Sequence, residues 1–557
     1  MTIKKSTFTK TKYLYKVVFG TYLLGGMHFS IDHLGGSGLY LPSNIIGWMF
    51  ISVLIGLGCW QIGKTTKLHY SQFYASCCLA FGLMCLPLLY TNSTYADLSL
   101  MRLLGLGGGI ILYLSFKQFQ FSLSERSWFL YIILGGIIIQ TLYGLIQNLN
   151  PSESWNDLGF KHINNILIQK NIMSTLLVTG ISISIFLLIN DRNVFEKKSK
   201  LFIIYTIVFF SSILIFPLQS RTGFLALLFA IILILKYSSL RSKPIQIWTG
   251  LLILGLTIGW RSTIDPRSEQ MSTYAENHRK LTYRLSFELF KNNPLTGVGY
   301  GGFLSSFRRY YAEKKQKDPS LLSIGNNNLN HPHNELLFWM VEGGILPLIG
   351  LLIIAGGFLI IIWRTRKKQS WSAFGMVFPI LLHTQLELPF YISVIHWFIF
   401  LYLIFYIDEE YGINKVSIIK FSFYPYVAAF IIPAIIIFYM STALQTAMII
   451  TKYERKRVKD PELLLLVKNS HAWKKKYETL AMSLHLDISK TTNDHEKIKE
   501  YVEWAEDYIR HSPYLFIYYD LATAYQALGD KEKAWHIYRH CQYLYPGTKW
   551  RDEPITK

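Results

Sequence analysis

The sequence predicts an all-α polytopic membrane protein that ends in a soluble α-helical domain. Hydrophobic residues make up 51% of the 557 positions and charged residues only 16%, a composition typical of integral membrane proteins. Apolar runs long enough to cross about 30 Å of hydrocarbon recur between residues 13 and 450. Beyond residue 450 these runs stop, and the remaining segment is rich in charged and aromatic residues. We therefore expect a transmembrane part followed by a separate helical domain.

The apolar runs divide the membrane part in two. Residues 1–260 are expected to form an N-terminal transmembrane bundle of about nine spans, and residues 334–450 about four more, or about thirteen in all. Clear runs are residues 45–60, 129–145, 201–218, 222–235 and 345–363. The first run is not expected to be a cleaved signal, because no small-residue cleavage site follows it and many spans come after.

Basic residues are concentrated in short connections. The formal net charge is +21, but the lysines and arginines do not form one patch, so nucleic-acid binding is not expected. They lie near the N-terminus, and at Lys64 and Lys67, residues 192–200, residues 236–243 and residues 364–368. An excess of positive charge marks cytoplasmic connections. Alternation from there places residues 261–333, a polar loop, on the outside.

The C-terminal segment, residues 451–557, contains a repeat-like pattern. Residues 518–546 fit one tetratricopeptide unit in the spacing of Tyr518, Ala522, Gly529, Ala534 and Pro546. An ordinary helical hairpin is the alternative interpretation. Thirteen spans from a cytoplasmic N-terminus place this domain outside, although the basic residues between 452 and 459 favour the cytoplasm; we favour the outside.

Arginines suited to phosphate lie at two places. Arg221, in Ser220-Arg221-Thr222-Gly223, opens an apolar run at the expected outer boundary, where a charged residue is costly unless it pairs or faces water. Arg279 and Arg284 lie on an expected short amphipathic helix in the outer loop. The planar guanidinium suits bidentate phosphate binding. The alternatives are a boundary anchor for Arg221 and a solvated basic face for the other two.

Histidines and glycines complete the loop. Four glycines in Pro294-Leu295-Thr296-Gly297-Val298-Gly299-Tyr300-Gly301-Gly302 predict a tight structural turn after the helix. In His331-Pro332-His333-Asn334-Glu335 an imidazole is suited to accept a proton near neutrality, and Asn334 is suited to cap the following helix. His383 and Glu387 are expected to share one helix face and pair there. The five cysteines form no metal motif or disulfide framework, so we expect no metal.

Together these motifs resemble the bacterial O-antigen ligase superfamily, and within it the protein O-oligosaccharyltransferases that glycosylate pilins and other exported proteins. The resemblance covers roughly residues 160–400. It also includes Gln169-Lys170-Asn171, Glu342-Gly343-Gly344 and His383-x3-Glu387-x-Pro389. Tyr283 is a departure, because many relatives carry tryptophan there; we expect it to serve as an aromatic packing position.

The resemblance implies a GT-C-like glycosyltransferase of the bacterial inner membrane whose active site faces the periplasm. It would move a glycan from undecaprenyl pyrophosphate to a Ser or Thr hydroxyl of an exported protein, without metal or cofactor. Arg221 and Arg279 would bind pyrophosphate and His333 would activate the acceptor. Binding roles are expected for Lys170, Asn171, Arg284, His331, Asn334 and Glu387.

Two rival interpretations stay open. The first keeps the chemistry but changes the acceptor to lipid A–core, as in an O-antigen ligase, or to a second lipid-linked glycan, as in a polymerase. The second is a transporter or flippase, which predicts internal repeats with paired broken helices. No such pairing is visible in the sequence, so catalysis is favoured.

Overall fold

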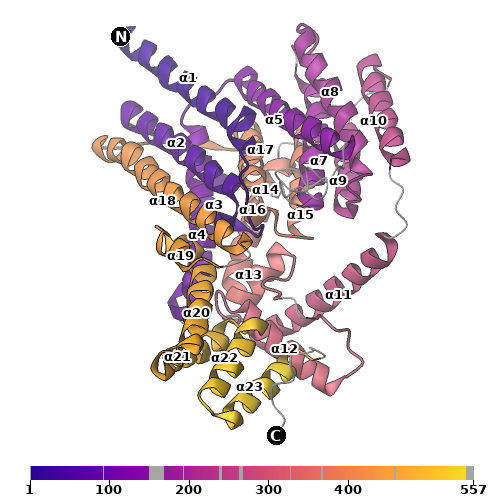
Figure 1. The fold of residues 1–557 in the computed structure, drawn as a ribbon. Coiled ribbons are helices and arrows are strands. Elements are labelled where there is room, and N and C mark those ends of the chain that lie inside the picture. The colour runs from indigo at the N-terminus through magenta and orange to yellow at the C-terminus, as the bar shows by residue number, and fades with distance from the viewer. Residues whose placement is uncertain are drawn as a thin grey trace.

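The computed structural model describes residues 2–91, 93–149, 169–191, 193–236, 241–262, 268–325, 328–364, 368–456 and 459–546. It is a bundle of long helices with a smaller helical domain at one end (Figure 1). The first half consists of α1 (Thr2–Leu24), α2 (Pro42–Thr65), α3 (Gln72–Cys85), α4 (Ser93–Lys117), α5 (Leu123–Leu149), α7 (Lys170–Asn190), α8 (Lys198–Ile215), α9 (Arg221–Leu235) and α10 (Lys243–Arg261), with short 3-10 turns at Gly26–His28, Gly38–Tyr40 and Leu86–Leu89.

The second half contains the loop predicted to carry the site and the remaining bundle helices. Its elements are α11 (Ser268–Asn292), α12 (Phe303–Lys317), α13 (Glu335–Gly343), α14 (Ile345–Arg364), α15 (Lys368–Thr384), α16 (Pro389–Ile392), α17 (Val394–Tyr411) and α18 (Phe423–Arg455). Helix α7 lies at the centre, because every residue from 172 to 188 is buried. Burial along its whole length means that other parts of the bundle surround this helix.

The described residues contain eight helices that are long and apolar enough to cross a membrane, namely α2, α3 with the turn after it, α4, α5, α7, α8, α14 and α18. The multi-pass prediction is thus confirmed. The count of about thirteen stays a prediction. Helices α1, α9, α10, α15 and α17 also contain apolar stretches, but they are shorter or carry more polar residues, such as Asp408-Glu409-Glu410 in α17.

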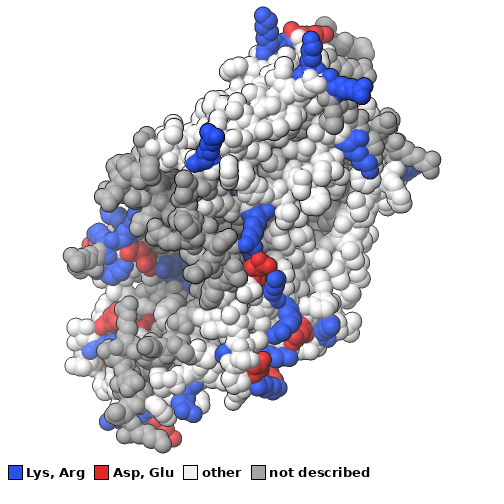
Figure 2. All heavy atoms as spheres, turned by 90° about the vertical axis from the view of Figure 1, so that its right-hand side faces the viewer, with Lys and Arg blue, Asp and Glu red and all other residues white. Residues whose placement is uncertain are grey.

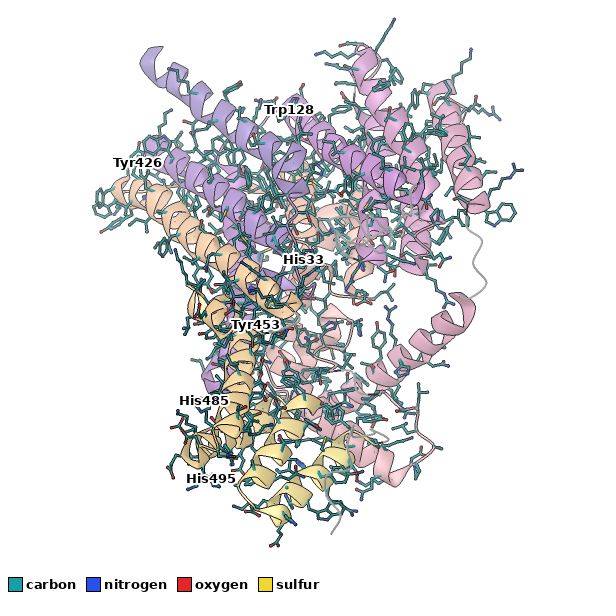
Figure 3. The ribbon with its side chains drawn as sticks, viewed as in Figure 1. His33, Trp128, Tyr426, Tyr453, His485 and His495 are labelled. Carbon is teal, nitrogen blue, oxygen red and sulfur yellow. The ribbon has the colours of Figure 1, made fainter. Side chains whose placement is uncertain are left out.

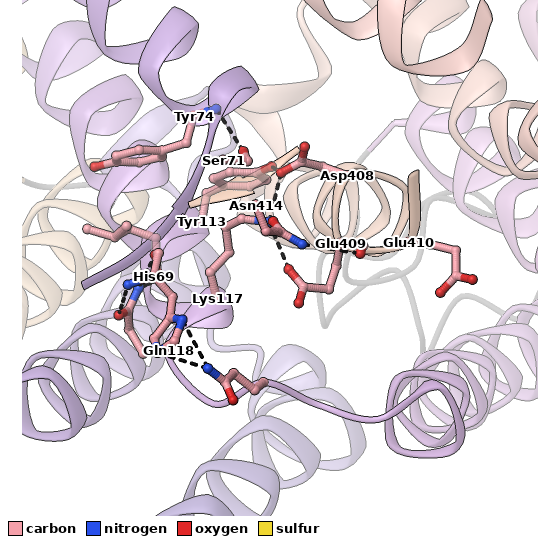
Figure 4. Close-up of polar contacts among 12 residues, drawn as sticks. His69, Ser71, Tyr74, Tyr113, Lys117, Gln118, Asp408, Glu409, Glu410 and Asn414 are labelled. Carbon is pink, nitrogen blue, oxygen red and sulfur yellow. Dashed lines mark hydrogen bonds and ion pairs between the residues drawn. The ribbon is translucent and has the colours of Figure 1, made fainter. Parts of the chain in front are cut away.

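A small antiparallel sheet corrects the expectation of a purely helical chain. Strand β1 (Lys67–Ser71) pairs with β2 (Asn414–Ile418), with Lys67 opposite Ile418 and Ser71 opposite Asn414. Both segments connect bundle helices, and lying side by side they satisfy each other's backbone groups. Beside the sheet, Lys117 forms ion pairs of 2.8 Å with both Asp408 and Glu409 (Figure 4). This buried cluster joins α4 to α17.

The C-terminal segment forms two consecutive helical hairpins. After α18 come the short α19 (Pro461–Leu465) and a 3-10 turn (Ser470–Trp473). The hairpins are α20 (Lys474–Thr491) with α21 (His495–His511), and α22 (Leu515–Ala527) with α23 (Lys531–Leu544). Figure 3 shows His485 and His495 in this domain, at the end of the molecule opposite Trp128 and Tyr426, with His33 and Tyr453 between. The helical domain is confirmed, whereas the tetratricopeptide repeat stays a prediction.

The helical domain packs against α12 of the polar loop. Ala312 of α12 lies in the apolar core of the domain. The Arg308 guanidinium lies 4.2 Å from the ring centroid of Tyr545, and an Arg309 Nη2–H donates to the carbonyl of Arg510 at 2.8 Å. The loop and the domain therefore lie at the same end of the bundle. The side of the membrane that this end faces stays a prediction.

Candidate active site

Helix α11 carries several of the polar side chains of the site. The sequence predicted a short helix, but α11 has 25 residues. It ends at Asn292, before Pro294, because proline cannot continue a helix from within. Glu276, Arg279, Lys280 and Tyr283 follow one another at i, i+3, i+4 and i+7, so they form one stripe on the helix surface. The predicted arginine of this loop thus lies in a line of polar groups.

His333 lies in a sharp bend that other groups hold in place. Its φ angle is +57°, in the left-handed region that non-glycine residues rarely adopt. Its backbone N–H donates to Nδ1 of His331 at 3.2 Å. The hydroxyl of Tyr283 donates to the carbonyl of His333 at 3.0 Å and faces that of Gln385 at 3.2 Å. Tyr283, expected only to pack, also fixes the bend that presents the imidazole.

Glu387 joins His333 to Arg279. The Nδ1–H of His333 donates to Oε2 of Glu387 at 2.6 Å, and an Nη2–H of Arg279 donates to Oε1. The Glu387 side chain is only 10% exposed. Burial alone raises the pKa of Glu387, but the hydrogen bond from His333 and the neighbouring positive charges bring that pKa below its ordinary value. The carboxylate therefore stays ionised and leaves Nε2 of His333 as the proton-accepting nitrogen.

The predicted pairing of His383 with Glu387 is wrong. Helix α15 ends at Thr384, so Glu387 lies in the turn beyond it rather than one helical turn along the same face. Its backbone N–H still donates to the His383 carbonyl at 2.9 Å. The His383 side chain instead contacts Thr175 Oγ1 at 2.9 Å. The turn lies just before Leu388-Pro389, where a residue preceding proline disfavours helix.

Arg221 is positioned by the N-terminus of α9. Ser220 caps this helix, since its hydroxyl oxygen accepts from the N–H of Gly223 at 3.1 Å. The same hydroxyl donates to Oδ1 of Asn171 at 2.9 Å, which ties α9 to the start of α7. An Nη1–H of Arg221 donates to Oε2 of Glu276 at 2.6 Å. Arg221 is therefore linked to the α11 stripe one helical turn before Arg279. Figure 2 shows basic and acidic side chains near one another on the side of the molecule that is on the right in Figure 1, where α11 lies.

The other predicted binding residues lie in different environments. Lys170 is an exposed first residue of α7. Arg284 is 60% exposed, and its Nε lies 3.9 Å from Glu288. Asn334 caps α13 as predicted, accepting from Leu337 N–H at 2.8 Å, and its Nδ2–H donates to the Gln385 carbonyl at 2.9 Å. Both ends of the Asn334 amide are thus held by protein.

The ring of His331 lies beside that of His333. Its ring centroid lies 4.5 Å from that of His333. Burial, together with the charge of His333, lowers the pKa of His331 to about 4. A neutral His331 can accept the hydrogen bond from the His333 backbone, so its position favours support of the bend.

The glycine-rich turn packs against the end of α13 and positions it. Gly297 has φ +67°, and a Cβ there would lie 2.5 Å from the Val341 carbonyl oxygen. The N–H of Val298 donates to that same oxygen at 2.8 Å. Side chains are excluded because the turn approaches the end of α13 so closely. The predicted structural turn is confirmed.

The sequence did not predict one buried ion pair of the structure. An Nη2–H of Arg102 in α4 donates to Oε2 of Glu342 at 2.6 Å, with side-chain exposures of 7% and 3%. The Arg102 guanidinium also lies 4.0 Å from the Trp339 ring centroid, and Oε1 of Glu342 accepts from Phe303 N–H at 3.2 Å. An arginine inside an apolar run was the available signal. The pair fixes α13, and so His333, to the membrane bundle.

Comparison with known families matches two parts of the chain. Residues 206–352 match the family described as O-antigen ligase, which includes Arg221, Arg279 and His333. Residues 371–554 match the family described as virulence factor membrane-bound polymerase, C-terminal, which includes Glu387 and the helical domain. No curated protein matches the chain. The chain is a multi-pass membrane enzyme, a glycosyltransferase that acts on lipid-linked oligosaccharides, and its residues 206–352 are similar to the O-antigen ligase family.

Proposed function

We propose that this glycosyltransferase moves a glycan from undecaprenyl pyrophosphate to a Ser or Thr hydroxyl of an exported protein, at the periplasmic face of the inner membrane. The observation that carries the proposal is the arrangement His333–Glu387–Arg279, linked through α11 to Arg221. It combines a base, an anion that orients the base, and two cations suited to a pyrophosphate leaving group.

The two arginines stabilise the leaving group. As the bond between the sugar C1 and the pyrophosphate oxygen breaks, the oxygen keeps the electron pair and negative charge develops on it. Guanidinium groups that are already in position stabilise that charge without a proton donor. Arg221, 66% exposed, and Arg279, 34% exposed, are both open to an incoming anion.

His333 activates the acceptor. Its Nε2 takes the hydroxyl proton as the acceptor oxygen forms its bond to C1 from the face opposite the leaving group. Glu387 holds the tautomer in which Nδ1 carries a proton, and it stabilises the imidazolium that forms, as the aspartate does in a Ser-His-Asp triad. The proton then passes to solvent, and undecaprenyl pyrophosphate leaves.

A protein acceptor is supported by the position of the helical domain. The two hairpins lie against α12, beside the loop that carries His333. Stacked helical hairpins offer a surface on which an extended segment of another protein can bind. A second candidate is polymerisation, in which the acceptor hydroxyl belongs to another lipid-linked glycan; the match to the polymerase C-terminal family favours it. An O-antigen ligase acting on lipid A–core is the remaining alternative.

Intact-mass spectrometry of exported proteins, from cells with and without the chain, tests the acceptor. We expect a glycan-sized mass that is lost on deletion and restored by the wild type but not by His333→Ala. A Lys291→Gln variant, altered at an exposed lysine in the last turn of α11, is the matched control and should restore it. Unchanged proteins alongside altered lipopolysaccharide ladders would contradict a protein acceptor and favour polymerase or ligase activity.

A further inference from the structure

Arg221 is not the only cation in contact with Glu276. The Nζ of Lys280 lies 2.9 Å from Oε1 of Glu276, while Nη1 of Arg221 lies 2.6 Å from Oε2. One carboxylate thus bridges a cation from α9 and a cation from α11. The two nitrogens lie on either side of a small anion, in the manner of a phosphate-binding pair.

This carboxylate lies at the surface. Glu276 is 45% exposed, and Arg221 and Lys280 are 66% and 71% exposed. The two cations lower the pKa of Glu276, with the hydrogen bond from Lys280 as the largest cause. The group is therefore an anion at neutral pH. Exposed ion pairs are weak because water screens them, so an anion of higher charge exchanges readily with such a carboxylate.

We propose that Lys280 is a third cation of the donor site and that Glu276 occupies, in the free enzyme, the position that the donor's pyrophosphate takes. This inference rests on the proposed function, and it names a binding residue and a competing residue in that same site. The pyrophosphate displaces the carboxylate and is then held by Arg221 from α9 and by Lys280 and Arg279 from α11.

The position on the α11 stripe distinguishes Lys280 from Arg284. The sequence predicted a binding role for Arg284 and none for Lys280. Lys280 follows Arg279 directly and lies one turn after Glu276, so its side chain belongs to the face that contacts Arg221. Arg284 lies one turn further and is directed to Glu288. Glu288 also contacts Lys314 of α12 at 2.9 Å. Arg284 thus belongs to a separate charge cluster, between α11 and α12.

The proposal predicts opposite effects for two neighbours on one helix. Removing the charge of Lys280 weakens the binding of undecaprenyl pyrophosphate, whereas removing the charge of Glu276 strengthens it. With exposed pairs of this kind, the expected changes in Kd are roughly two- to fivefold in each direction. A purely structural bridge between α9 and α11 would instead make both substitutions weaken binding.

Binding of undecaprenyl pyrophosphate to the purified full-length enzyme in detergent, measured by isothermal titration calorimetry, tests this. Lys280→Gln should raise Kd, Lys280→Arg should restore it, and Glu276→Gln should lower it. Lys291→Gln, which removes a positive charge from the last turn of the same helix, is the control and should leave Kd unchanged. Glycan transfer assayed on the same preparations should show the Lys280→Gln effect in donor KM rather than in kcat.

The outcomes separate this inference from the function on which it rests. Wild-type Kd in Lys280→Gln, together with weak binding in Arg221→Gln, would overturn the role of Lys280 and leave the donor site standing. Weaker binding in Glu276→Gln would overturn the competing role of the carboxylate. If Arg221→Gln and Lys280→Gln both bound like the wild type, the donor site itself would be wrong.

Discussion

Replacing Glu387 by glutamine tests whether one carboxylate serves both the base and an arginine. A glutamine oxygen can accept from His333 or from Arg279, but the amide NH2 then faces the other donor. One charge-assisted hydrogen bond is therefore lost. If the glutamine oxygen stays bound to Arg279, the lost bond is the 2.6 Å contact to Nδ1 of His333. Such a bond contributes about 1.5–3 kcal/mol. We expect kcat to fall roughly 10- to 150-fold.

The change should appear in kcat rather than in donor affinity. A neutral residue 387 leaves Arg279 free for the pyrophosphate, so the Kd for undecaprenyl pyrophosphate should stay the same or decrease. Single-turnover transfer and donor binding, measured on the same detergent-solubilised enzyme, separate the two. Unchanged kcat, or a Kd that rises as much as kcat falls, would refute the shared-carboxylate mechanism.

Glu335→Gln is the matched control for that experiment. Glu335 lies two residues from His333, and its Oε1 accepts from Trp339 Nε1–H at 2.8 Å and from the Tyr391 hydroxyl at 3.1 Å. Burial raises the pKa of Glu335 above its ordinary value and so makes its neutral, protonated form more accessible. Glutamine has nearly the shape of that form and keeps an accepting oxygen. Activity should stay within about twofold of the wild type.

Further predictions concern the supports of the site. Gly297→Ala places a Cβ 2.5 Å from the Val341 oxygen at a residue with φ +67°. The loss of stability should be well over the roughly 1 kcal/mol that the left-handed backbone alone costs a non-glycine residue. Gly325→Ala is the control, because its φ is +61° but the space around it is open, so it measures the backbone cost alone. Burial lowers the pKa of His331 to about 4 in the folded protein. Between about pH 6.5 and 4 the unfolded chain therefore binds a proton at this residue while the folded protein does not, so the free energy of unfolding decreases as the pH is lowered through that range. His331→Gln should show a shallower fall in Tm from pH 7 to 4.5, and an unchanged slope would contradict the assignment. Tyr545→Ala removes the ring beneath Arg308, 4.2 Å away, and should increase protease cleavage between the bundle and the helical domain without changing donor Kd.

The sequence was sufficient for the features that depend on local pattern. Apolar runs predicted the multi-pass arrangement because each run must cross the bilayer by itself. Asn334 and Pro294 predicted a helix start and a helix end because caps and breakers act on adjacent backbone. The glycine turn was assigned correctly for the same reason.

Features that depend on which segments meet were missed or misassigned. Glu387 was paired with His383 on helical spacing, yet it binds His333, which is 54 residues away in sequence. The pair of Arg102 and Glu342 joins residues 240 positions apart. The strand pairing of residues 67–71 with residues 414–418 has no local signature either. Such contacts arise from the packing of the whole bundle, which periodicity along one segment does not encode.

The two arginines differ in how tightly carboxylates hold them, and this difference suggests the order of events. Arg221 and Glu276 are exposed at 66% and 45%, so their pair is weak and exchanges first. Arg279 is held by Glu387, which is 10% exposed, and breaking a buried pair is costly unless the remaining charge keeps a partner. Glu387 does keep one, because His333 contacts its other oxygen. We therefore expect the pyrophosphate to bind Arg221 first and to draw Arg279 away second. After that movement Glu387 contacts only His333, so we expect the carboxylate to support His333 as a base most strongly once the leaving group is bound.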